Sequence, residues 1–386
     1  MKLKQIGQDN KVNRKKVLKK VSRIVIKIGS GVLTTPDRSG LDDTVIEEIT
    51  RQVSTLHKSG HETILVSSGA IAAGVKELNL KKTPVDIPHK QAAAAIGQSR
   101  LIGKYERHFK REGLNVAQIL LTHDDLSNRI RYLNAKNTIL TILSYKVIPI
   151  INENDTVAVD EIKFGDNDTL SAMVANLIEA DLLIILSDVK GLYSADPKLD
   201  PTAELIPVVE KITNEIEVMA GDSRSATGVG GMVTKIQAAK RLSHSGIPTV
   251  IVGGKVNGII EAVIKGEEVG TLFLPEEDKL GSKKYWIAYT LKSKGKVRVD
   301  NGAKNVLIAD GKSLLPSGIL EIEGKFKSGD MVSCIDSRNR EFARGLVNYS
   351  SNELKKIKGK RSSEIEEILG YKMVDEAIHR DNLVIL

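Results

Sequence analysis

The sequence of 386 residues predicts an α/β protein with an open, mainly parallel sheet sandwiched by helices, followed by a small, mainly β domain. From residue 23 to about 274, short aliphatic runs alternate with amphipathic stretches, which is typical of strand–helix–strand units. The runs are rich in β-branched residues and almost entirely apolar, as expected of strands buried on both faces. Beyond residue 280 the runs are short and separated by glycines, which favours a second, β-rich domain.

Six strands and five helices are predicted in the first region. Between the first two strands, apolar residues recur at helical spacing from Ile46 to Leu56, and Gly60 follows as a helix stop. The predicted strands are Arg23–Ile28, Glu62–Ser67, Val116–Leu121, Val147–Ile151, Leu182–Leu186 and Thr249–Val252. The other predicted helices are His89–Arg111, Arg129–Ser144, Asn167–Glu179 and Val233–Ser245.

The second region is predicted to hold four strands and a single helix, Ser363–Leu369. Its strands are expected at Lys296–Asp300, Leu320–Glu323, Met331–Ile335 and Ala343–Tyr349. The domain division follows: a basic N-terminal extension over 1–20, the α/β domain over 21–280 and the small domain over 293–386, joined by a charged stretch.

The net charge of +8 lies mostly at the N-terminus. Residues 1–20 hold eight lysines and arginines against one aspartate, and residues 293–386 hold 17 against 14 acidic residues. The α/β body between them is therefore slightly acidic, which argues against a nucleic-acid-binding body. A basic terminal arm is commonly just solvated, and we assign it no function.

Several other classes of protein are excluded by composition. The single cysteine, Cys334, cannot form an internal disulfide, which predicts a reducing, cytoplasmic location. The apolar stretch Val21–Ile28 is interrupted by Arg23 and Lys27, so neither a signal peptide nor a membrane span is expected. The histidines are scattered and no nucleophile-elbow motif is present, so zinc and serine-hydrolase chemistry lack support.

Three glycine-rich segments indicate a phosphate site. Lys27–Gly31 and Ser67–Ala70 end predicted strands, and Gly228–Met232 precedes the helix that carries Lys235. Glycine lets backbone N–H groups approach a phosphate, and ligands of α/β folds bind where strands end. Each segment alone is more typical of a tight strand-to-helix turn with a solvated lysine, and it is the three together that favour a phosphate site. None has Walker A spacing, and Val233 breaks the dinucleotide fingerprint, so a phosphate site of another type is predicted.

Two polar runs and one strand end are further candidates. Asn152–Asp155 and Gly165–Asp168 are dense in side chains that hold ammonium groups or organise lysines and metals. The alternative is an Asx-rich turn and a helix N-cap. Ser187–Tyr193 ends a strand and is a candidate for holding a base and ribose, with an ordinary turn as its alternative.

These motifs, in this order, resemble those of the glutamate 5-kinases, within the amino acid kinase superfamily. The C-terminal motifs resemble the PUA domain attached to bacterial members. The likeness covers nearly all of the chain from residue 23 onwards. The motifs that carry it are Val25–Ser30, Val66–Gly74, Ile151–Asp155, Gly165–Asp168, Ser187–Tyr193, Gly230–Lys235, Leu314–Gly318, Tyr349–Leu354 and His379–Asp381.

The resemblance implies the amino acid kinase fold and ATP-dependent phosphorylation of the glutamate side-chain carboxylate, giving γ-glutamyl phosphate for proline biosynthesis. It implies that Lys27 and Lys235 flank the transferring phosphoryl group, and that Asp168 holds both ammonium groups. It assigns the amino acid to Ser68, Asp155 and Asn167. The implied ATP-binding residues are Lys27, Ser187, Asp188, Val229, Gly230, Gly231, Met232, Val233, Thr234 and Lys235. Mg²⁺ is implied as a cofactor held mainly through the ATP phosphates, without a protein metal site.

The chemistry of the residues fits this reaction. A glutamate carboxylate, with an ordinary pKa of about 4.3, is ionised at neutral pH and needs no general base. The reaction instead needs neutralisation of charge between an anionic nucleophile and an anionic phosphate, which lysines, backbone N–H groups and Mg²⁺ supply. Two departures from the family pattern, Gly31 for serine and Val229 for threonine, put hydroxyl contacts there in doubt.

Two other functions remain open. One is a different acyl or phosphate kinase of the superfamily, because acceptor choice depends on few pocket residues. The other is RNA binding by the PUA-like domain, suggested by the basic cluster between Lys355 and Arg361. The resemblance also implies a homo-oligomer (dimer or tetramer), feedback inhibition by proline near Asp155 and Asn167, and transfer of the labile product to a glutamyl phosphate reductase.

Overall fold

The computed structural model describes residues 14–37, 40–158, 167–197, 199–222, 231–276 and 281–386. The chain forms two compact units, residues 1–279 and 280–386, and each is described by itself. Within the described ranges no helix is both long enough and apolar enough to cross a membrane.

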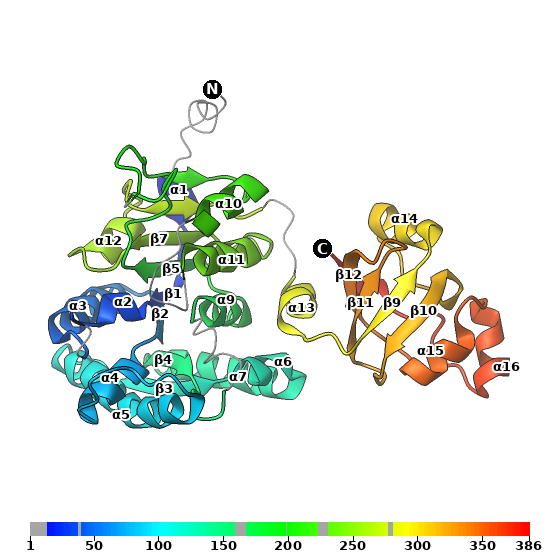
Figure 1. Ribbon diagram of the computed structural model, residues 1–386, viewed down its shortest axis with the longest axis horizontal. Helices are drawn as coiled ribbons and strands as arrows, with labels where there is room; N and C mark the ends of the chain where they lie inside the picture. The colour runs from blue at the N-terminus through cyan, green and yellow to red at the C-terminus, as the bar shows by residue number, and fades with distance from the viewer. Residues whose placement is uncertain (1–13, 38–39, 159–166, 198, 223–230, 277–280) are drawn as a thin grey trace. The chain divides into compact units, whose positions relative to one another are not determined.

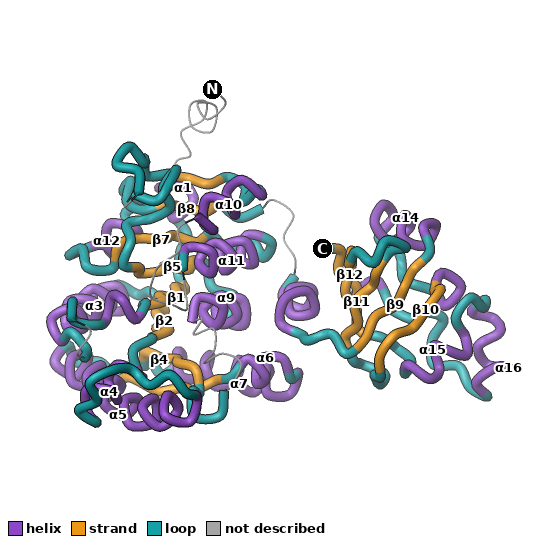
Figure 2. The backbone as a smooth tube through the Cα atoms, in the orientation of Figure 1, coloured by secondary structure: helices purple, strands orange, loops and turns teal. Residues whose placement is uncertain are grey.

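The N-terminal unit is built on one sheet. Its described strands run in the order β3-β4-β2-β1-β5-β7-β8-β6, so β1 lies near the centre (Figure 2). Neighbouring strands pair in parallel except β7 and β8, which are antiparallel. The strands are β1 (Arg23–Ile28), β2 (Glu62–Ser67), β3 (Val116–Leu121), β4 (Ile148–Glu153), β5 (Leu182–Ser187), β6 (Val208–Val209), β7 (Thr249–Gly253) and β8 (Thr271–Phe273).

Helices cover both faces of this sheet (Figure 1). Helices α3 and α12 pack on one face, and α9 and α11 pack on the other. The described helices of this unit are α1 (Arg14–Leu18), α2 (Ser30–Leu33), α3 (Asp43–Lys58), α4 (Ala70–Glu77), α5 (Ile87–Arg111), α6 (His123–Ser127), α7 (Arg129–Ser144), α9 (Asn167–Leu177), α10 (Asn214–Asp222), α11 (Met232–Ser243) and α12 (Ile259–Ile264). The predicted sandwich of a mainly parallel sheet is confirmed.

The predicted strands agree closely with the structure, and β1, β2 and β3 have the predicted bounds. The largest difference among them is at β4, which continues past Ile151 to Glu153. Its last two residues are polar, which is why the sequence pattern ended the strand early. Both are buried, with Asn152 only 3% exposed and Glu153 8%. Asn152 is thereby fixed on the sheet rather than on a loop.

Helices α4 and α5 pack backbone to backbone because each carries a glycine at the contact. A Cβ on Gly74 would lie 1.8 Å from the Ala93 carbonyl oxygen, and one on Gly97 would lie 1.8 Å from that of Ala70. Gly69, which precedes α4, has a φ of 105°, a left-handed conformation that favours glycine. These glycines hold the turn after β2 against α5.

The C-terminal unit is a five-stranded sheet in its described residues, in the order β10-β9-β11-β12-β13, with short helices around it. Its strands are β9 (Gly295–Val299), β10 (Ile319–Gly324), β11 (Met331–Ile335), β12 (Glu341–Leu346) and β13 (Leu383–Ile385). Its α-helices are α13 (Ser282–Tyr285), α14 (Asn301–Asp310), α15 (Ser351–Ile357) and α16 (Ile365–Leu369), and a π-helical turn spans Trp286–Thr290. The mainly β character is confirmed.

The prediction of a single helix in this unit was wrong. Helix α14 is capped by Asp300, whose side chain accepts from the backbone N–H of Ala303, and α15 begins with a capping box of Ser350 and Glu353. Leu307 is the buried residue of α14, so this helix lacks the apolar periodicity on which the prediction relied.

The glycine contact predicts a contrast between two substitutions in α5. Gly97→Ala should lower the free energy of unfolding by about 1–3 kcal/mol, because its methyl group meets the α4 backbone. Gly103→Ala, in the same helix with nothing within 4 Å of the new Cβ, should stabilise by up to about 1 kcal/mol. Denaturant midpoints measure both, and equal effects would contradict the packing described.

Candidate active site

The predicted site residues at or just after the ends of β4, β2, β1 and β5 lie at one edge of the sheet, because these strands are successive neighbours and run in parallel. Backbone hydrogen bonds join the strand ends. The Ser68 N–H donates to the Ile28 carbonyl at 3.1 Å, and the Gly29 N–H donates to the Leu186 carbonyl at 3.1 Å. The ends of β2, β1 and β5 therefore form one connected surface.

A buried aspartate lies between two lysines at this edge. Lys27 Nζ of β1 is 2.5 Å from Asp168 Oδ1, and Lys235 Nζ of α11 is 3.2 Å from Asp168 Oδ2. Asp168 is 1% exposed and each lysine is 5% exposed. The three residues come from three separate elements, β1, α9 and α11. The structure thus brings together the three residues predicted to be catalytic.

Two effects act on the Asp168 carboxyl. Burial raises its pKa, but the charges of Lys27 and Lys235 outweigh burial and hold the pKa below its ordinary value. The carboxyl is therefore ionised at neutral pH. One negative charge between two positive charges leaves this cluster with a net positive charge, which suits an anionic ligand.

Thr234 and Gly231 fix the Lys235 side of the cluster. Thr234 Oγ1 lies 2.7 Å from Asp168 Oδ2 and 2.9 Å from the Gly231 carbonyl oxygen, and these two acceptors share its single hydroxyl proton. Gly231 is the extended residue before α11, and α11 packs against α9. Met232 opens α11, and Val233 in its first turn is exposed. The link from Thr234 to Asp168 was not predicted, because Thr234 was assigned to ATP alone.

On the β2 and β4 side, Asn167 gathers three acceptors. Its Nδ2 lies 3.1 Å from the Ser67 carbonyl, 2.9 Å from Ser68 Oγ and 3.0 Å from Asn152 Oδ1. Asn167 directly precedes Asp168 in α9, so the same helix start serves both groups. Asn152 was not among the predicted site residues. Its signal in the sequence was its place at the head of the Asn152–Asp155 run.

On the β5 side, Ser187 and Asp188 end the strand. Ser187 Oγ donates to Asp188 Oδ1 at 3.2 Å. Gly31 lies against Asp188, since a Cβ there would be 3.4 Å from the Asp188 Cβ. The turn after β1 is therefore closely packed against the turn after β5.

The remaining predicted residues have different outcomes. Asp155 follows β4 and is partly buried, and burial raises its pKa to about 6. Val229 and Gly230 lie outside the described residues. Gly165 and Asp166, the first half of the motif that contains Asn167 and Asp168, also lie outside them. Their assignments stay predictions.

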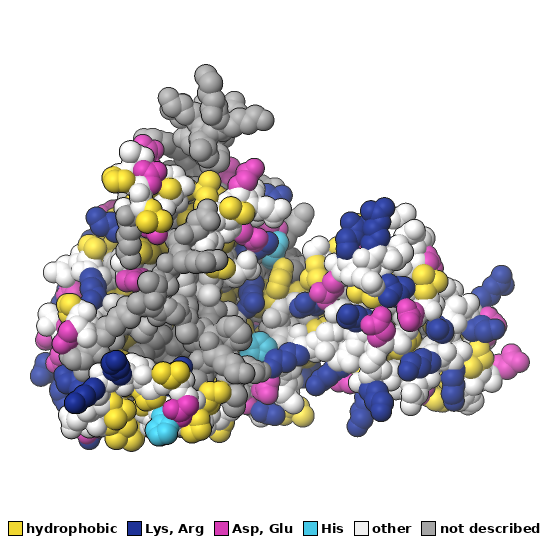
Figure 3. Space-filling model, in the orientation of Figure 1, with side chains coloured by type: hydrophobic (Ala, Val, Ile, Leu, Met, Phe, Trp, Pro, Cys, Tyr) yellow, Lys and Arg dark blue, Asp and Glu magenta, His cyan; other side chains and the backbone are white. Residues whose placement is uncertain are grey.

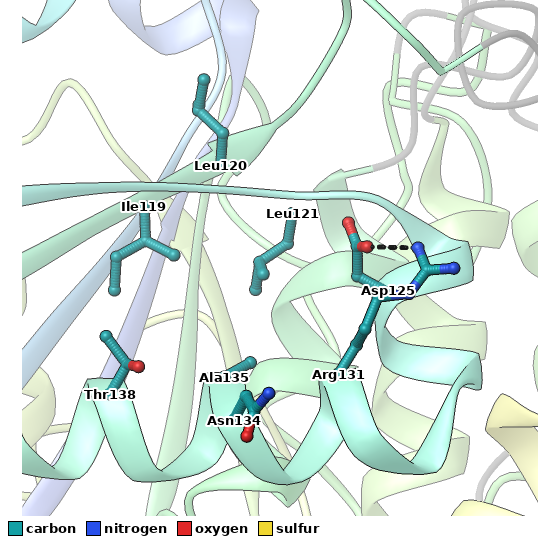
Figure 4. Close-up of a pocket in the computed structure, with 8 residues that line it drawn as sticks. All are labelled: Ile119, Leu120, Leu121, Asp125, Arg131, Asn134, Ala135 and Thr138. Atoms are coloured by element: carbon teal, nitrogen blue, oxygen red, sulfur yellow. Dashed lines mark hydrogen bonds and ion pairs between the residues drawn. The ribbon is translucent and has the colours of Figure 1, made fainter.

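A surface hollow lies elsewhere in the N-terminal unit, between β3 and α7 (Figure 4). Asp125 and Arg131 form an ion pair at 2.8 Å in its lining. The lining residues are Ile119, Leu120, Leu121, Asp125, Arg131, Asn134, Ala135 and Thr138. None of the lysine–aspartate cluster lines it, so we do not place the chemistry there.

Comparison with known proteins identifies the family. Residues 22–253 match the family model described as the amino acid kinase family, and residues 295–369 match the PUA domain. A glutamate 5-kinase of Pelobacter propionicus is 54% identical over 373 residues, covering 97% of this chain and 100% of the relative. One of Geobacter sulfurreducens is 56% identical over 373 residues with the same coverage. The chain belongs to the glutamate 5-kinase family.

The resemblance predicted from the motifs is thereby confirmed, and the amino acid kinase and PUA assignments of the two units with it. A more distant glutamate 5-kinase, from Thermoanaerobacter sp., is 50% identical over 364 residues, covering 94% of this chain and 98% of the relative. Among solved structures, a UMP kinase of Bacillus anthracis matches with a TM-score of 0.46 at 15% identity, over 66% of this chain and 97% of that one.

In this member of the glutamate 5-kinase family, replacing Asp168 and replacing Asp155 should have different effects on the free energy of unfolding. Asp168→Asn should lower the free energy of unfolding by about 3 kcal/mol, because two buried ammonium groups lose their counter-charge. Asp155→Asn should leave stability unchanged or slightly higher, since burial already disfavours that carboxylate. Chemical denaturation at neutral pH measures both, and a stable Asp168→Asn variant would contradict the pairing.

Proposed function

We propose that this protein catalyses ATP-dependent phosphorylation of the L-glutamate side-chain carboxylate to γ-glutamyl 5-phosphate, the first step of proline biosynthesis. The observation that carries the proposal is the buried Lys27–Asp168–Lys235 cluster, at the sheet edge between the ends of β2 and β5. Relatives named glutamate 5-kinase, at 54% and 56% identity, support the choice of substrate.

The cluster suits a transfer between two anions. The attacking oxygen belongs to an ionised carboxylate, and it approaches a γ-phosphoryl group that is also negatively charged. Lys27 and Lys235 neutralise charge on the phosphoryl oxygens as bonding shifts from the β–γ bridge to the carboxylate oxygen. Asp168 holds both ammonium groups in place through contacts of 2.5 Å and 3.2 Å. No proton has to be removed from the nucleophile.

The two substrates are assigned to opposite sides of β1. Ser68, Asp155 and Asn167, near the ends of β2 and β4, take the amino acid. Ser187 and Asp188 at the end of β5, with the start of α11 from Gly231 to Lys235, take the nucleotide. The N-terminus of α11 offers backbone N–H groups to phosphate. Val229 and Gly230 complete the predicted ATP-binding set.

Mg²⁺ is the proposed cofactor. The donor set fits a metal carried by the ATP phosphates, because the two lysines suit anionic oxygens and Asp168 is already engaged by both. When bound, Mg²⁺ supplies further charge neutralisation on the phosphates. The residues that would hold the metal–nucleotide complex are Lys27, Lys235 and the first turn of α11.

The proposal extends to partners. Proline, like glutamate, carries an α-carboxylate and a protonated α-nitrogen, although its ammonium group is secondary, so we propose feedback inhibition near Asp155 and Asn167. Initial rates at varied glutamate concentrations test this, and inhibition that glutamate does not relieve would contradict it. An acyl phosphate is labile, which favours transfer of the product to a glutamyl phosphate reductase.

The proposal also includes assembly of this protein into a homo-oligomer (dimer or tetramer) and a cytoplasmic location.

RNA binding by the C-terminal unit is the less favoured alternative. Several of its basic residues are paired with acidic ones: Arg298 contacts Glu321 at 2.9 Å, Lys304 contacts Asp336 at 2.8 Å, and Lys360 of the basic cluster lies 3.8 Å from Glu364. On the face shown in Figure 3, the two signs of charge are interspersed on this unit. RNA-binding surfaces more commonly concentrate one sign of charge.

Trapping with hydroxylamine tests reaction and acceptor together. With ATP and Mg²⁺, L-glutamate should yield hydroxamate, whereas acetylglutamate and aspartate should not. Lys235→Met should lower the rate by about 10² or more, because a charge on the transferring group is left uncompensated. Turnover only with another acceptor would move the protein to another superfamily activity, and no turnover would favour the RNA-binding alternative.

The raised pKa of Asp155 predicts a pH dependence. Because burial raises this pKa to about 6, the carboxylate that is assigned to the substrate ammonium becomes protonated below that pH. The kcat/KM for glutamate should therefore fall about tenfold per pH unit below about 6. Asp155→Asn should have a lower kcat/KM without that inflection. An unchanged inflection in the variant would assign it to another group.

A further inference from the structure

We propose that Gln98 of α5 is a positioning residue for the amino-acid side of the site, and that it acts through Asn152. Its side-chain oxygen holds the Asn152 amide in the orientation that keeps Asn152 Oδ1 facing the Asn167 NH₂ group, which supports the orientation of Asn167 towards the substrate ammonium group. The inference rests on the proposed function, and it assigns a role to a residue that no motif of the sequence singled out.

The three side chains form a chain of amide hydrogen bonds. Asn152 Nδ2 donates to Gln98 Oε1 at 2.8 Å, and Asn167 Nδ2 donates to Asn152 Oδ1 at 3.0 Å. Asn152 is 3% exposed and Asn167 is 8% exposed, whereas Gln98 is partly buried. The chain therefore runs from the outer helix α5, through the end of β4, to the residue that precedes Asp168.

The direction of the chain is fixed by a group that can only accept. Asn167 lies 3.1 Å from the Ser67 carbonyl oxygen, so the atom facing that oxygen must be the Nδ2 donor. Asn152 must then present its Oδ1 to Asn167, which turns its Nδ2 towards Gln98. Gln98 must in turn present its Oε1. Each amide orientation follows from the previous one.

This direction leaves an acceptor for the substrate. The Nδ2 end of Asn167 faces oxygens of Ser67, Ser68 and Asn152, which share its two N–H donors. The Oδ1 end of Asn167 is therefore the end available to an ammonium donor. A flipped Asn152 would place an NH₂ group against the Asn167 NH₂ group, which is repulsive. Gln98 disfavours that flip by accepting from Asn152.

Helix α5 is well suited to this role because it is held firmly against the site. Gly97, next to Gln98, packs on the α4 backbone. About two helical turns further along, the fully buried Tyr105 shares a 2.9 Å hydrogen bond with Ser67 Oγ. Both contacts fix α5 relative to the turn after β2. The backbone of Gln98, and with it the reach of its side chain towards Asn152, is therefore held in place.

The test compares Gln98→Met with Gln98→Glu in the full-length protein. Met keeps the length of the side chain but removes the acceptor, whereas Glu keeps an acceptor oxygen. Gln98→Met should raise KM for glutamate about tenfold, the effect of one lost hydrogen bond, while KM for ATP and the melting temperature change little. Gln98→Glu should stay within about threefold of the wild type in the same assay. An equal rise in both variants, or a matching rise in KM for ATP, would overturn the proposal.

A double-variant comparison tests the route through Asn152. In an Asn152→Ala background, Gln98→Met should add no further rise in KM for glutamate, because its partner is gone. Additive effects would overturn the proposal. Its failure is separable from that of the proposed function: a wild type that forms hydroxamate from glutamate, beside a Gln98→Met variant with unchanged KM, refutes the role of Gln98 alone.

Discussion

The ion pairs of one buried carboxylate with two lysines are the constraint on which the rest of the site depends. Lys27 and Lys235 lie in the interior, and charges of the same sign there are costly unless an opposite charge compensates them. Asp168 provides it, and its own pKa is held down by the same two charges. The arrangement needs β1, α9 and α11 to meet at one point, which the central position of β1 in the sheet allows. The charge balance of the cluster therefore depends on the fold that brings these three elements together.

Around this cluster, close backbone packing gives the site its shape. Gly74 and Gly97 bring α4 and α5 into contact, and the turn after β2 is held between α5 and the start of α9. On the other side of β1 lies the end of β5, and α11 packs against α9 and β7. Lys27 and Lys235 thus lie at a sheet edge with the ends of β2 and β4 on one side and the end of β5 on the other. This arrangement suits an enzyme that must align two anionic substrates and hold them close together.

Much of this was predictable from sequence, because it depends on local signals. Apolar β-branched runs identified six strands of the N-terminal unit but not the short strands β6 and β8. Motif order identified Lys27, Asp168 and Lys235. The misses have physical causes. Asn152 was placed outside its strand because a polar residue does not look buried, yet its amide is satisfied by Gln98 and Asn167. Helix α14 was missed because it buries little apolar surface. Long-range amide pairing, such as Gln98 with Asn152, leaves no spacing pattern in a single sequence.

The central claim is that a glutamate carboxylate oxygen attacks phosphorus directly at the Lys27–Asp168–Lys235 cluster. The most direct measurement uses L-glutamate labelled with ¹⁸O in its side-chain carboxylate, with hydroxylamine present to cleave the acyl phosphate. Hydroxylamine displaces phosphate by breaking the carbon–oxygen bond, so the bridging oxygen leaves with the phosphate. The account predicts one ¹⁸O in the phosphate released per hydroxamate formed. Released phosphate without the label would contradict it.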